Sequence, residues 1–552
     1  MKEKNRKESG EISRRDLLIG AGAVVVGGAA GVVAGVLTPG PEGPAGSAGS
    51  AGATGSAGPT GPAGATGPAG AGALPTTWDY ETDVVIAGSG NGGMSAGIAA
   101  AKAGAKVIVI EISSTTGGGS SYSGGGIHAH GAETTDDYLK GMDGLHDPEL
   151  GPFYFEKFQE YKKWLVDIDA YVTQGYGAVT SPSYYASDLT MGKGEEPPLH
   201  CRSYFDSLER IFGEAGGTIL LKTRALKILT DEEGTIVGLR AKGPAGVLNI
   251  KAKAVILSCG GFQNNPEIRV KYLGPEADLA SVLGVPYNRG DGMSMAQEVG
   301  AALSSSMSNF SALFMPAFPF HNVQEVPAEY EALPYTPDGK EALWRKCRFA
   351  SVFAIIVNVY GKRYIDERSQ SYRVEMATVK QRQAKGIYVF DQPIRAKVAP
   401  WRGYDPVEEI AKGGGVVAKA DTISELADQL ASQPYALQTP LHKAAFIRTI
   451  EEYNEAVAAG KAEELEVPRT GTVAKIETPP FYAVPVTPWI YMCYGGVAIN
   501  KNAQVLDMQK EPIPRLYATP PVAGGVFREI YTGAIGCAGT FGWVAGKHAA
   551  AL

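Results

Sequence analysis

The chain has 552 residues, and its 51 basic side chains against 58 acidic ones give a net charge of −7. This weakly acidic balance, without a basic tract, argues against nucleic acid as a partner. The 5 cysteines are widely spaced and form no motif for zinc, c-type haem or an iron–sulfur cluster, so we predict buried free thiols and no metal site. Glycine is abundant, with 71 residues, and it falls into an N-terminal repeat and a globular body long enough for two domains.

Residues 1–39 resemble a twin-arginine export signal. Ser13-Arg14-Arg15-Asp16-Leu17-Leu18 follows a charged segment and opens an uncharged apolar run over 17–37, although Ile19 stands where the pattern usually has lysine. Because this pathway carries folded proteins, the resemblance implies a tightly bound cofactor. It also implies a location in the periplasm or at the outer face of the cytoplasmic membrane or cell wall. The run is long enough to span a bilayer of about 30 Å, so cleavage and retention as a membrane anchor both stay open.

Residues 40–73 are predicted to be a linker. Glycine recurs at every third position through most of this segment, as in collagen, but proline fills few of the positions between. We favour a flexible tether, with a reach on the order of 100 Å at about 3.1 Å per residue, that holds the body clear of a membrane or wall. A trimerising stalk is the alternative.

A dinucleotide-binding fingerprint opens the globular body. A β-branched run over 82–87 leads into Gly88-Ser89-Gly90-Asn91-Gly92-Gly93, an Ala-rich helical stretch follows, and a second apolar run ends at Glu111. In such a unit Gly88 permits the tight turn, Gly90 lets a pyrophosphate approach, and Gly93 lets the helix pack on the strand. Glu111 is placed to accept hydrogen bonds from ribose hydroxyls, which disfavours NADP. The fingerprint alone leaves FAD and NAD open.

The sequence beyond the fingerprint resembles a flavoprotein family. The segments that carry the resemblance are Thr115-Thr116-Gly117-Gly118-Gly119-Ser120-Ser121-Tyr122-Ser123-Gly124-Gly125-Gly126, Ser258-Cys259-Gly260-Gly261-Phe262, Asn288-Arg289-Gly290-Asp291-Gly292, Gly361-Lys362-Arg363-Tyr364-Ile365-Asp366-Glu367, Gly495-Gly496-Val497 and Tyr531-Thr532-Gly533-Ala534-Ile535-Gly536. The family groups fumarate reductase and succinate dehydrogenase flavoprotein subunits, urocanate reductase and 3-ketosteroid dehydrogenases. The resemblance spans about residues 80–552.

This resemblance implies an α/β fold and FAD as the cofactor. A Rossmann-like FAD-binding domain of the glutathione-reductase type is expected over 80–303 and 469–552, with an inserted α+β capping domain over 304–468. The helix after Gly533 is expected to point its N-terminus at the flavin. The implied cofactor-binding residues are Gly88, Gly90, Asn91, Gly92, Gly93, Glu111, Thr116, Gly117, Gly118, Ser123, Gly124, Gly125, Asp291, Gly495, Gly533, Ile535 and Gly536.

At two positions this chain lacks the side chains that bind substrate or donate the proton in fumarate and urocanate reductases. Their His-Thr-Met-Gly-Gly segment is replaced by Tyr491-Met492-Cys493-Tyr494 before Gly495, and Ser371 stands four residues after Glu367. A clamp for a dicarboxylate is therefore not expected, although Arg373 remains a candidate proton donor.

Tyrosines stand in place of those groups, as in the 3-ketosteroid dehydrogenase branch, which we take as the nearer one. In an enone, a hydrogen-bonded ketone gathers enolate charge while hydride moves between the β-carbon and flavin N5, and a second tyrosine exchanges the α-proton. Tyr372 is the candidate for proton transfer, and Tyr491 or Tyr494 for the carbonyl. Tyr122 is expected to line the flavin face.

The sequence thus predicts an exported FAD-dependent oxidoreductase that reduces or introduces a C=C bond conjugated to a carbonyl, on an apolar ketosteroid-like enone. Because no haem or FMN segment is present, a separate membrane quinol or cytochrome partner is expected to exchange the electrons. One alternative is a fumarate- or urocanate-type carboxylic enoate reductase in anaerobic respiration. Another is a surface-displayed binding protein without enzymatic activity.

Overall fold

The computed structural model describes residues 74–129, 132–174, 189–191, 199–316, 353–369, 372–402, 405–412, 415–432, 437 and 439–552. The predicted export signal (1–39) and linker (40–73) lie outside these ranges. All described residues belong to one compact unit, 66–552. None of the helices within the described ranges is long and apolar enough to cross a membrane.

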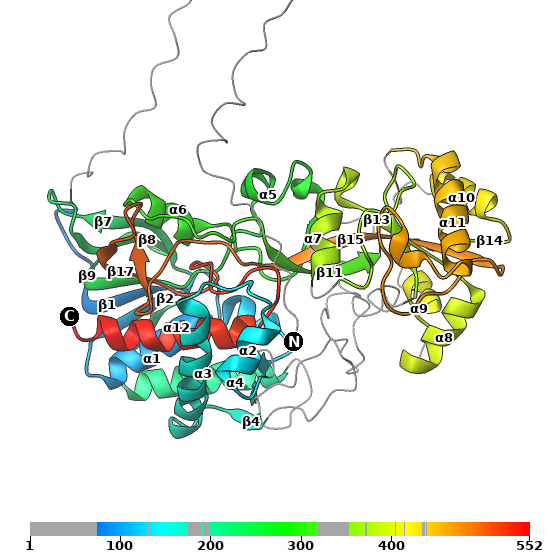
Figure 1. The fold of residues 1–552 in the computed structure, drawn as a ribbon. Coiled ribbons are helices and arrows are strands. Elements are labelled where there is room, and N and C mark those ends of the chain that lie inside the picture. The colour runs from blue at the N-terminus through cyan, green and yellow to red at the C-terminus, as the bar shows by residue number, and fades with distance from the viewer. Residues whose placement is uncertain are drawn as a thin grey trace, which may run out of the picture. The chain divides into compact units, whose positions relative to one another are not determined.

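The predicted fingerprint lies in an eight-stranded mixed sheet (Figure 1). Its strands run in the order β16 (Gln504–Leu506), β17 (Pro512–Ala518), β9 (Gly246–Leu257), β1 (Tyr80–Ala87), β2 (Val107–Ile110) and β6 (Thr218–Leu220), and β7 (Arg224–Thr230) and β8 (Ile236–Gly243) join through β9. β1 pairs in parallel with both β2 and β9. Since β2 is buried throughout, its sequence is a continuous apolar run instead of an alternating one.

Two helices that lie far apart in the sequence run side by side beneath this sheet in Figure 1: α1 (Asn91–Lys102), in blue, and α12 (Ala534–Ala549), in red. Glycines on α12 permit the contact. A Cβ atom on Gly542 would lie 2.1 Å from the Gly92 carbonyl oxygen, and one on Gly546 would lie 2.2 Å from that of Ala96. Any side chain at these positions would push the two backbones apart.

A six-stranded sheet forms around β15 (Phe481–Cys493), which pairs with four other strands. They are β10 (Ser281–Val282), β11 (Phe310–Pro316), β13 (Gly386–Asp391) and β14 (Ala418–Ala420), and β12 (Ile355–Val357) pairs with β13. Strands β11 to β14 lie within the predicted capping segment 304–468, whereas β15 lies after the end of that segment. The sheet is therefore built from both sides of the predicted boundary, because β13 and β14 use β15 as their partner.

The remaining elements are short strands and helices around these sheets. They are η1 (Gly118–Tyr122), β3 (Gly126–Ile127), α2 (Thr135–Gly141), α3 (Leu150–Asp167), β4 (Val172–Gln174), β5 (Leu189–Met191), α4 (Leu199–Glu214), α5 (Pro266–Tyr272), η2 (Ala277–Leu279), α6 (Asp291–Glu298), α7 (Arg373–Val379), η7 (Arg382–Ala384), α8 (Gln392–Arg402), α9 (Pro406–Lys412), α10 (Ile423–Ser432), α11 (Lys443–Ala458) and η8 (Ala462–Glu464). Four cysteines are free thiols: Cys201, Cys493 and Cys537 are buried and Cys259 is half-buried, while Cys347 lies outside the described ranges.

Candidate active site

Around the turn between β1 and α1, three glycines are crowded (Gly88, Gly92 and Gly93) and one, Gly90, is open. A Cβ atom on Gly88, whose φ is +103°, would lie 2.4 Å from the Ser258 carbonyl oxygen, and one on Gly93 would lie 1.9 Å from that of Gly88. At Gly90 the nearest atom would be 3.6 Å away, on Ser120. α1 begins after Gly90 with no side-chain cap and no acidic residue in its first turn. The open backbone and the positive end of the helix fit a pyrophosphate.

Glu111 is held firmly beside this turn. It follows β2 and is 4% exposed. One carboxylate oxygen accepts hydrogen bonds from the Ser89 amide (2.9 Å) and hydroxyl (2.6 Å), and the other accepts one from the Ser113 amide (2.9 Å). The carboxylate is therefore fixed at the strand end where a ribose would lie in a dinucleotide fold.

A second glycine-rich turn lies against the first. The Gly117 amide donates to the Ser89 carbonyl oxygen (3.1 Å), and a Cβ atom on Gly118 would meet Gly90 Cα at 3.8 Å. Ser123 caps the end of η1, because its hydroxyl donates to the Ser120 carbonyl oxygen (2.8 Å) and accepts from the Gly125 amide (3.1 Å). Gly124 is exposed, and so is Tyr122, at 55%. Backbone from 88–93 and 117–125 thus forms one cradle that fits the phosphates of FAD.

Thr116 is buried, and its side chain faces α4. Its hydroxyl donates to Glu209, and Arg202 donates to its carbonyl oxygen (3.3 Å). The side chain is thus engaged within the protein, where the sequence predicted a cofactor contact. Its structural role is to anchor the start of the second turn.

Asn91 is fully buried, and its side chain joins four helices. The amide nitrogen donates to the Ile535 carbonyl oxygen (2.9 Å) and to the Tyr161 hydroxyl (3.1 Å), and the amide oxygen accepts from the Tyr204 hydroxyl (2.8 Å). These bonds fix the start of α1 against α3, α4 and the first turn of α12. Asn91 was predicted as a cofactor-binding residue, and its side chain is used for this internal bonding.

The other predicted cofactor residues lie at tight backbone contacts or in an ion pair. A Cβ atom on Gly495 would lie 2.4 Å from Met307 Cα, and one on Gly533 would lie 2.0 Å from the His128 carbonyl oxygen, which also crowds Gly536. Asp291 begins α6 and receives two hydrogen bonds from Arg224 on β7, at 2.9 and 3.0 Å. No local pattern in the sequence marks His128 or Arg224 as partners of these residues.

Three tyrosines, which we call the tyrosine cluster, meet edge to face: Tyr372, Tyr491 and Tyr531. The ring centroids are 5.8 Å apart for Tyr372 with Tyr491, 5.8 Å for Tyr372 with Tyr531, and 6.1 Å for Tyr491 with Tyr531. The Tyr531 hydroxyl accepts a hydrogen bond from the Ala534 amide (3.0 Å), the first residue of α12. The structure thus brings two predicted residues together at this helix end. The third member, Tyr531, was not predicted as a catalytic residue. Its position two residues before Gly533 is the feature of the sequence that could have indicated it.

Tyr494 lies beside the tyrosine cluster and is more deeply buried, at 3% exposed. Its hydroxyl shares a hydrogen bond with the Ser311 hydroxyl, and its ring packs on Phe527 at 5.0 Å. Phe527 in turn contacts Tyr531. The other tyrosine predicted for the carbonyl, Tyr491, meets the ring of Tyr372 edge to face.

Burial raises the pKa of Tyr491, Tyr494 and Tyr531 above the usual tyrosine value, and charge repulsion by the neighbouring Tyr372 adds to this effect. These phenols, which are neutral at pH 7 even at the usual pKa, therefore stay protonated well into the alkaline range and can act as hydrogen-bond donors. Arg373, the first residue of α7, forms a half-exposed ion pair with Glu529 (Nε to Oε2, 2.8 Å).

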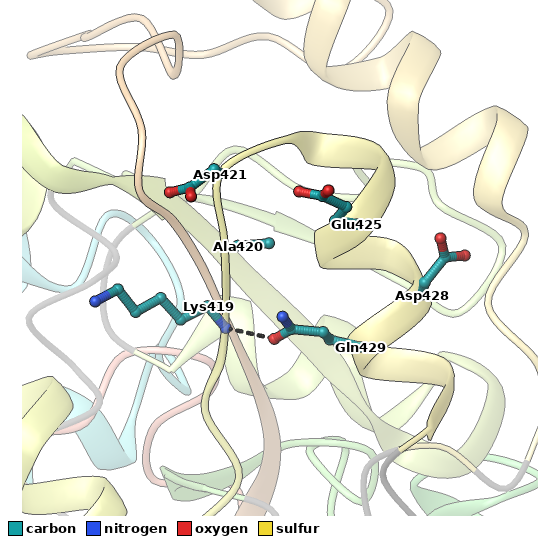
Figure 2. A pocket seen from close by; sticks show the side chains of 6 residues that line it. All are labelled: Lys419, Ala420, Asp421, Glu425, Asp428 and Gln429. Atoms are coloured by element: carbon teal, nitrogen blue, oxygen red, sulfur yellow. Dashed lines mark hydrogen bonds between the residues drawn. The ribbon is translucent and has the colours of Figure 1, made fainter.

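A surface hollow lies elsewhere, between β14 and α10 (Figure 2). It is lined by Lys419, Ala420, Asp421, Glu425, Asp428 and Gln429. The Lys419 amide donates to Gln429 (3.0 Å), and Asp428 is paired with Lys443 (2.7 Å). None of the six lining residues belongs to the predicted site.

Comparison with known proteins identifies the fold. The family described as FAD binding domain matches residues 83–539. A probable fumarate reductase of Shewanella frigidimarina is 29% identical, covering 85% of this chain and 75% of that protein. A 3-oxosteroid 1-dehydrogenase of Mycolicibacterium smegmatis is 26% identical, covering 85% and 97%. The structure of a flavocytochrome c3 fumarate reductase in its open conformation aligns with a TM-score of 0.61 at 27% identity, over 86% of this chain and 79% of that one.

These similarities confirm the predicted α/β FAD-binding fold and the predicted cofactor, FAD. Because the relatives are reductases and dehydrogenases, the alternative of a binding protein without enzymatic activity was wrong. Both fumarate reductases and ketosteroid dehydrogenases are among the similar proteins.

Proposed function

The chain belongs to the FAD binding domain family and is a FAD-dependent oxidoreductase, and on that premise we propose that it acts on a C=C bond conjugated to a carbonyl, at the tyrosine cluster. The observation that carries this proposal is the meeting of Tyr372, Tyr491 and Tyr531 at the N-terminus of α12. The printed names of relatives, fumarate reductase, urocanate reductase and 3-oxosteroid 1-dehydrogenase, support this class of reaction.

FAD, when bound, supplies or accepts hydride at the double bond. The chain's own residues would hold it: the backbone at Gly90 and Gly118 would bind the pyrophosphate, and Glu111 would bind the ribose. The N-terminus of α12, from Gly533 to Gly536, would stabilise negative charge on the ring system. Asn91 and Thr116 act indirectly, by fixing the backbone that makes these contacts.

Tyr491 and Tyr531 donate hydrogen bonds to the substrate carbonyl oxygen, where negative charge develops during the reaction. Both phenols are protonated at neutral pH, as donors must be, and their raised pKa keeps them protonated further into the alkaline range. Tyr372, which contacts both rings, transfers the proton at the α-carbon. Apolar, aromatic surroundings favour a ketosteroid-like enone as the substrate.

A carboxylic enoate is the second candidate substrate. Arg373 lies next to Tyr372 in the chain, and its guanidinium would bind a carboxylate if Glu529 released it. Identity to the fumarate reductase, at 29%, also slightly exceeds the 26% to the 3-oxosteroid 1-dehydrogenase.

The export signal at 1–39 and an external electron partner remain part of the proposal. A protein held outside the cytoplasm has no access to NADH, so reduction would draw on a membrane quinol or a cytochrome. The apolar run over 17–37 supports either a cleaved signal or an anchor.

Turnover of a panel by the full-length holoenzyme with reduced viologen tests this function. The panel contains 4-androstene-3,17-dione, cinnamate, urocanate and fumarate. We expect reduction of the ketosteroid, and a loss in kcat on the order of a hundredfold in Tyr372→Phe. Turnover of fumarate alone would overturn the enone assignment, and a near-normal rate in Tyr372→Phe would transfer the proton-donor role to Arg373.

A further inference from the structure

The pairing of β15 is irregular at Tyr491. Ser311 on β11 lies opposite Met492, and the next residue, Ala312, lies opposite Ile490. Tyr491 is therefore left without a partner on β11, as the extra residue of a β-bulge. On the other side of β15, the pairing with β10 ends at Ile490. A bulge breaks the alternation of side chains along a strand and redirects the residue it contains.

A glutamine outside both strands binds the backbone of this bulge. The Gln263 side-chain amide donates a hydrogen bond to the Tyr491 carbonyl oxygen (3.0 Å). Gln263 is 2% exposed, so water does not compete for this bond. The Gln263 side chain thus supplies the Tyr491 carbonyl oxygen with the hydrogen bond that a neighbouring strand would otherwise supply.

The segment that carries Gln263 is itself held by hydrogen bonds of the two residues that follow it. The backbone N–H of its neighbour Asn264 donates to the Asn288 carbonyl oxygen (2.8 Å), and the Asn264 side chain donates to the Val285 carbonyl oxygen (3.0 Å). The next residue, Asn265, caps α5 by accepting from the Ile268 amide (3.1 Å). This segment follows β9 of the cofactor-binding sheet, so Gln263 connects a fixed part of that sheet to the substrate tyrosine.

We propose that Gln263 is a positioning residue for Tyr491. By holding the bulge, it places the phenol against the rings of Tyr372 and Tyr531, where the carbonyl donor is needed. This inference rests on the proposed function, because it takes Tyr491 as a donor to the substrate. Small displacements of a reacting group reduce rates steeply, so a single lost backbone bond is expected to affect turnover.

A double-mutant cycle tests the inference with Gln263→Met, which keeps the size of the side chain and removes its donor, and Tyr491→Phe. The holoenzymes are assayed with reduced viologen and the panel compound that the wild type reduces fastest. Flavin absorbance and Tm report folding. Gln381→Met is the matched control, because Gln381 also donates to a backbone carbonyl, that of Ala377 (3.1 Å).

We expect Gln263→Met to lower kcat about tenfold with full flavin content, and Gln381→Met to stay within about twofold. In the Tyr491→Phe background, Gln263→Met should cause no further loss, because it acts through the phenol that is already absent. If Gln263→Met retains no flavin, Gln263→Asn, which shortens the reach of the amide, enters the same cycle with the same expectation.

Two results would overturn the inference in different ways. In the first, Tyr491→Phe is slow, but Gln263→Met is either as fast as the wild type or lowers kcat by the same factor in the Tyr491→Phe background as in the wild type. Gln263 then does not position Tyr491, and the proposed function stands. If Tyr491→Phe and Tyr372→Phe both keep the wild-type rate, the proposed function fails, and the role of Gln263 fails with it.

Discussion

The cofactor cradle and the tyrosine cluster are built in opposite ways. In the cradle, Gly88, Gly90, Gly93 and Glu111 lie within one strand–turn–helix–strand unit, and backbone geometry does most of the work. In the cluster, Tyr372, Tyr491 and Tyr531 come from three separate segments, and side chains do the work. The cradle should therefore be sensitive to added atoms, and the cluster to lost hydroxyls.

The largest expected effect is that of Gly93→Ala. Its Cβ atom would lie 1.9 Å from the Gly88 carbonyl oxygen, so the turn must open. We expect a loss of about 3 kcal/mol in the free energy of unfolding and loss of bound FAD. Gly90→Ala is the matched variant, because its Cβ has room in the protein: it should unfold like the wild type and bind FAD more weakly. Denaturant unfolding and FAD titration measure both, and equal destabilisation by the two variants would contradict this view of the cradle.

The next effect tests the cluster. Tyr531→Phe removes the hydroxyl that accepts from Ala534 and, in our proposal, donates to the substrate. We expect kcat to fall on the order of tenfold or more while FAD remains bound. Tyr517→Phe is the control, because its hydroxyl also has a partner, His548 at 2.8 Å, but lies outside the cluster. A similar loss in both variants would show that the effect is general and not specific to the cluster.

Alkaline pH should weaken the protein through the same phenols. Burial holds the pKa of Tyr491, Tyr494 and Tyr531 above that of tyrosine in an unfolded chain, which is about 10. The unfolded chain therefore loses these protons first, and stability should be fully present below about pH 10 and fall above it. Unfolding midpoints between about pH 8 and 11 should show this fall, with a shallower slope in Tyr494→Phe. A slope unchanged by that substitution would argue against the buried phenol as its source.

The smallest effect is expected at an ion pair beside the cradle. Arg224 and Asp291 form two hydrogen bonds, but Arg224 is 49% exposed, so solvent screens the pair. Arg224→Ala should cost at most about 1 kcal/mol in unfolding free energy. An FAD titration of this variant also shows whether Asp291, once released, changes cofactor affinity. A much larger loss of unfolding free energy would contradict this expectation, and would mean that the Arg224–Asp291 pair stabilises α6 more than an exposed ion pair should.

The sequence predicted those features whose residues are neighbours in the chain. The unit β1–α1–β2 was predicted because a glycine turn between two apolar runs has few other solutions. The internal hydrogen bonds of the Asn91 and Thr116 side chains were not predicted, because their partners, Ile535 and Glu209, lie 444 and 93 residues away in the chain. The pairing of β13 with β15 was not predicted for the same reason, because pairing between strands far apart in the chain leaves no local mark in the sequence.

By itself, the sequence determined the FAD-binding fold and the glycine turns, since backbone conformation at Gly88 and the βαβ pattern are local properties. It also named Tyr372 and Tyr491 as candidates. Only the tertiary structure decided that these two meet Tyr531, that Tyr494 lies deeper against Ser311, and that Gln263 binds the bulge at Tyr491. Such contacts depend on how distant segments pack, and packing is settled by the whole core at once and by no single stretch of chain.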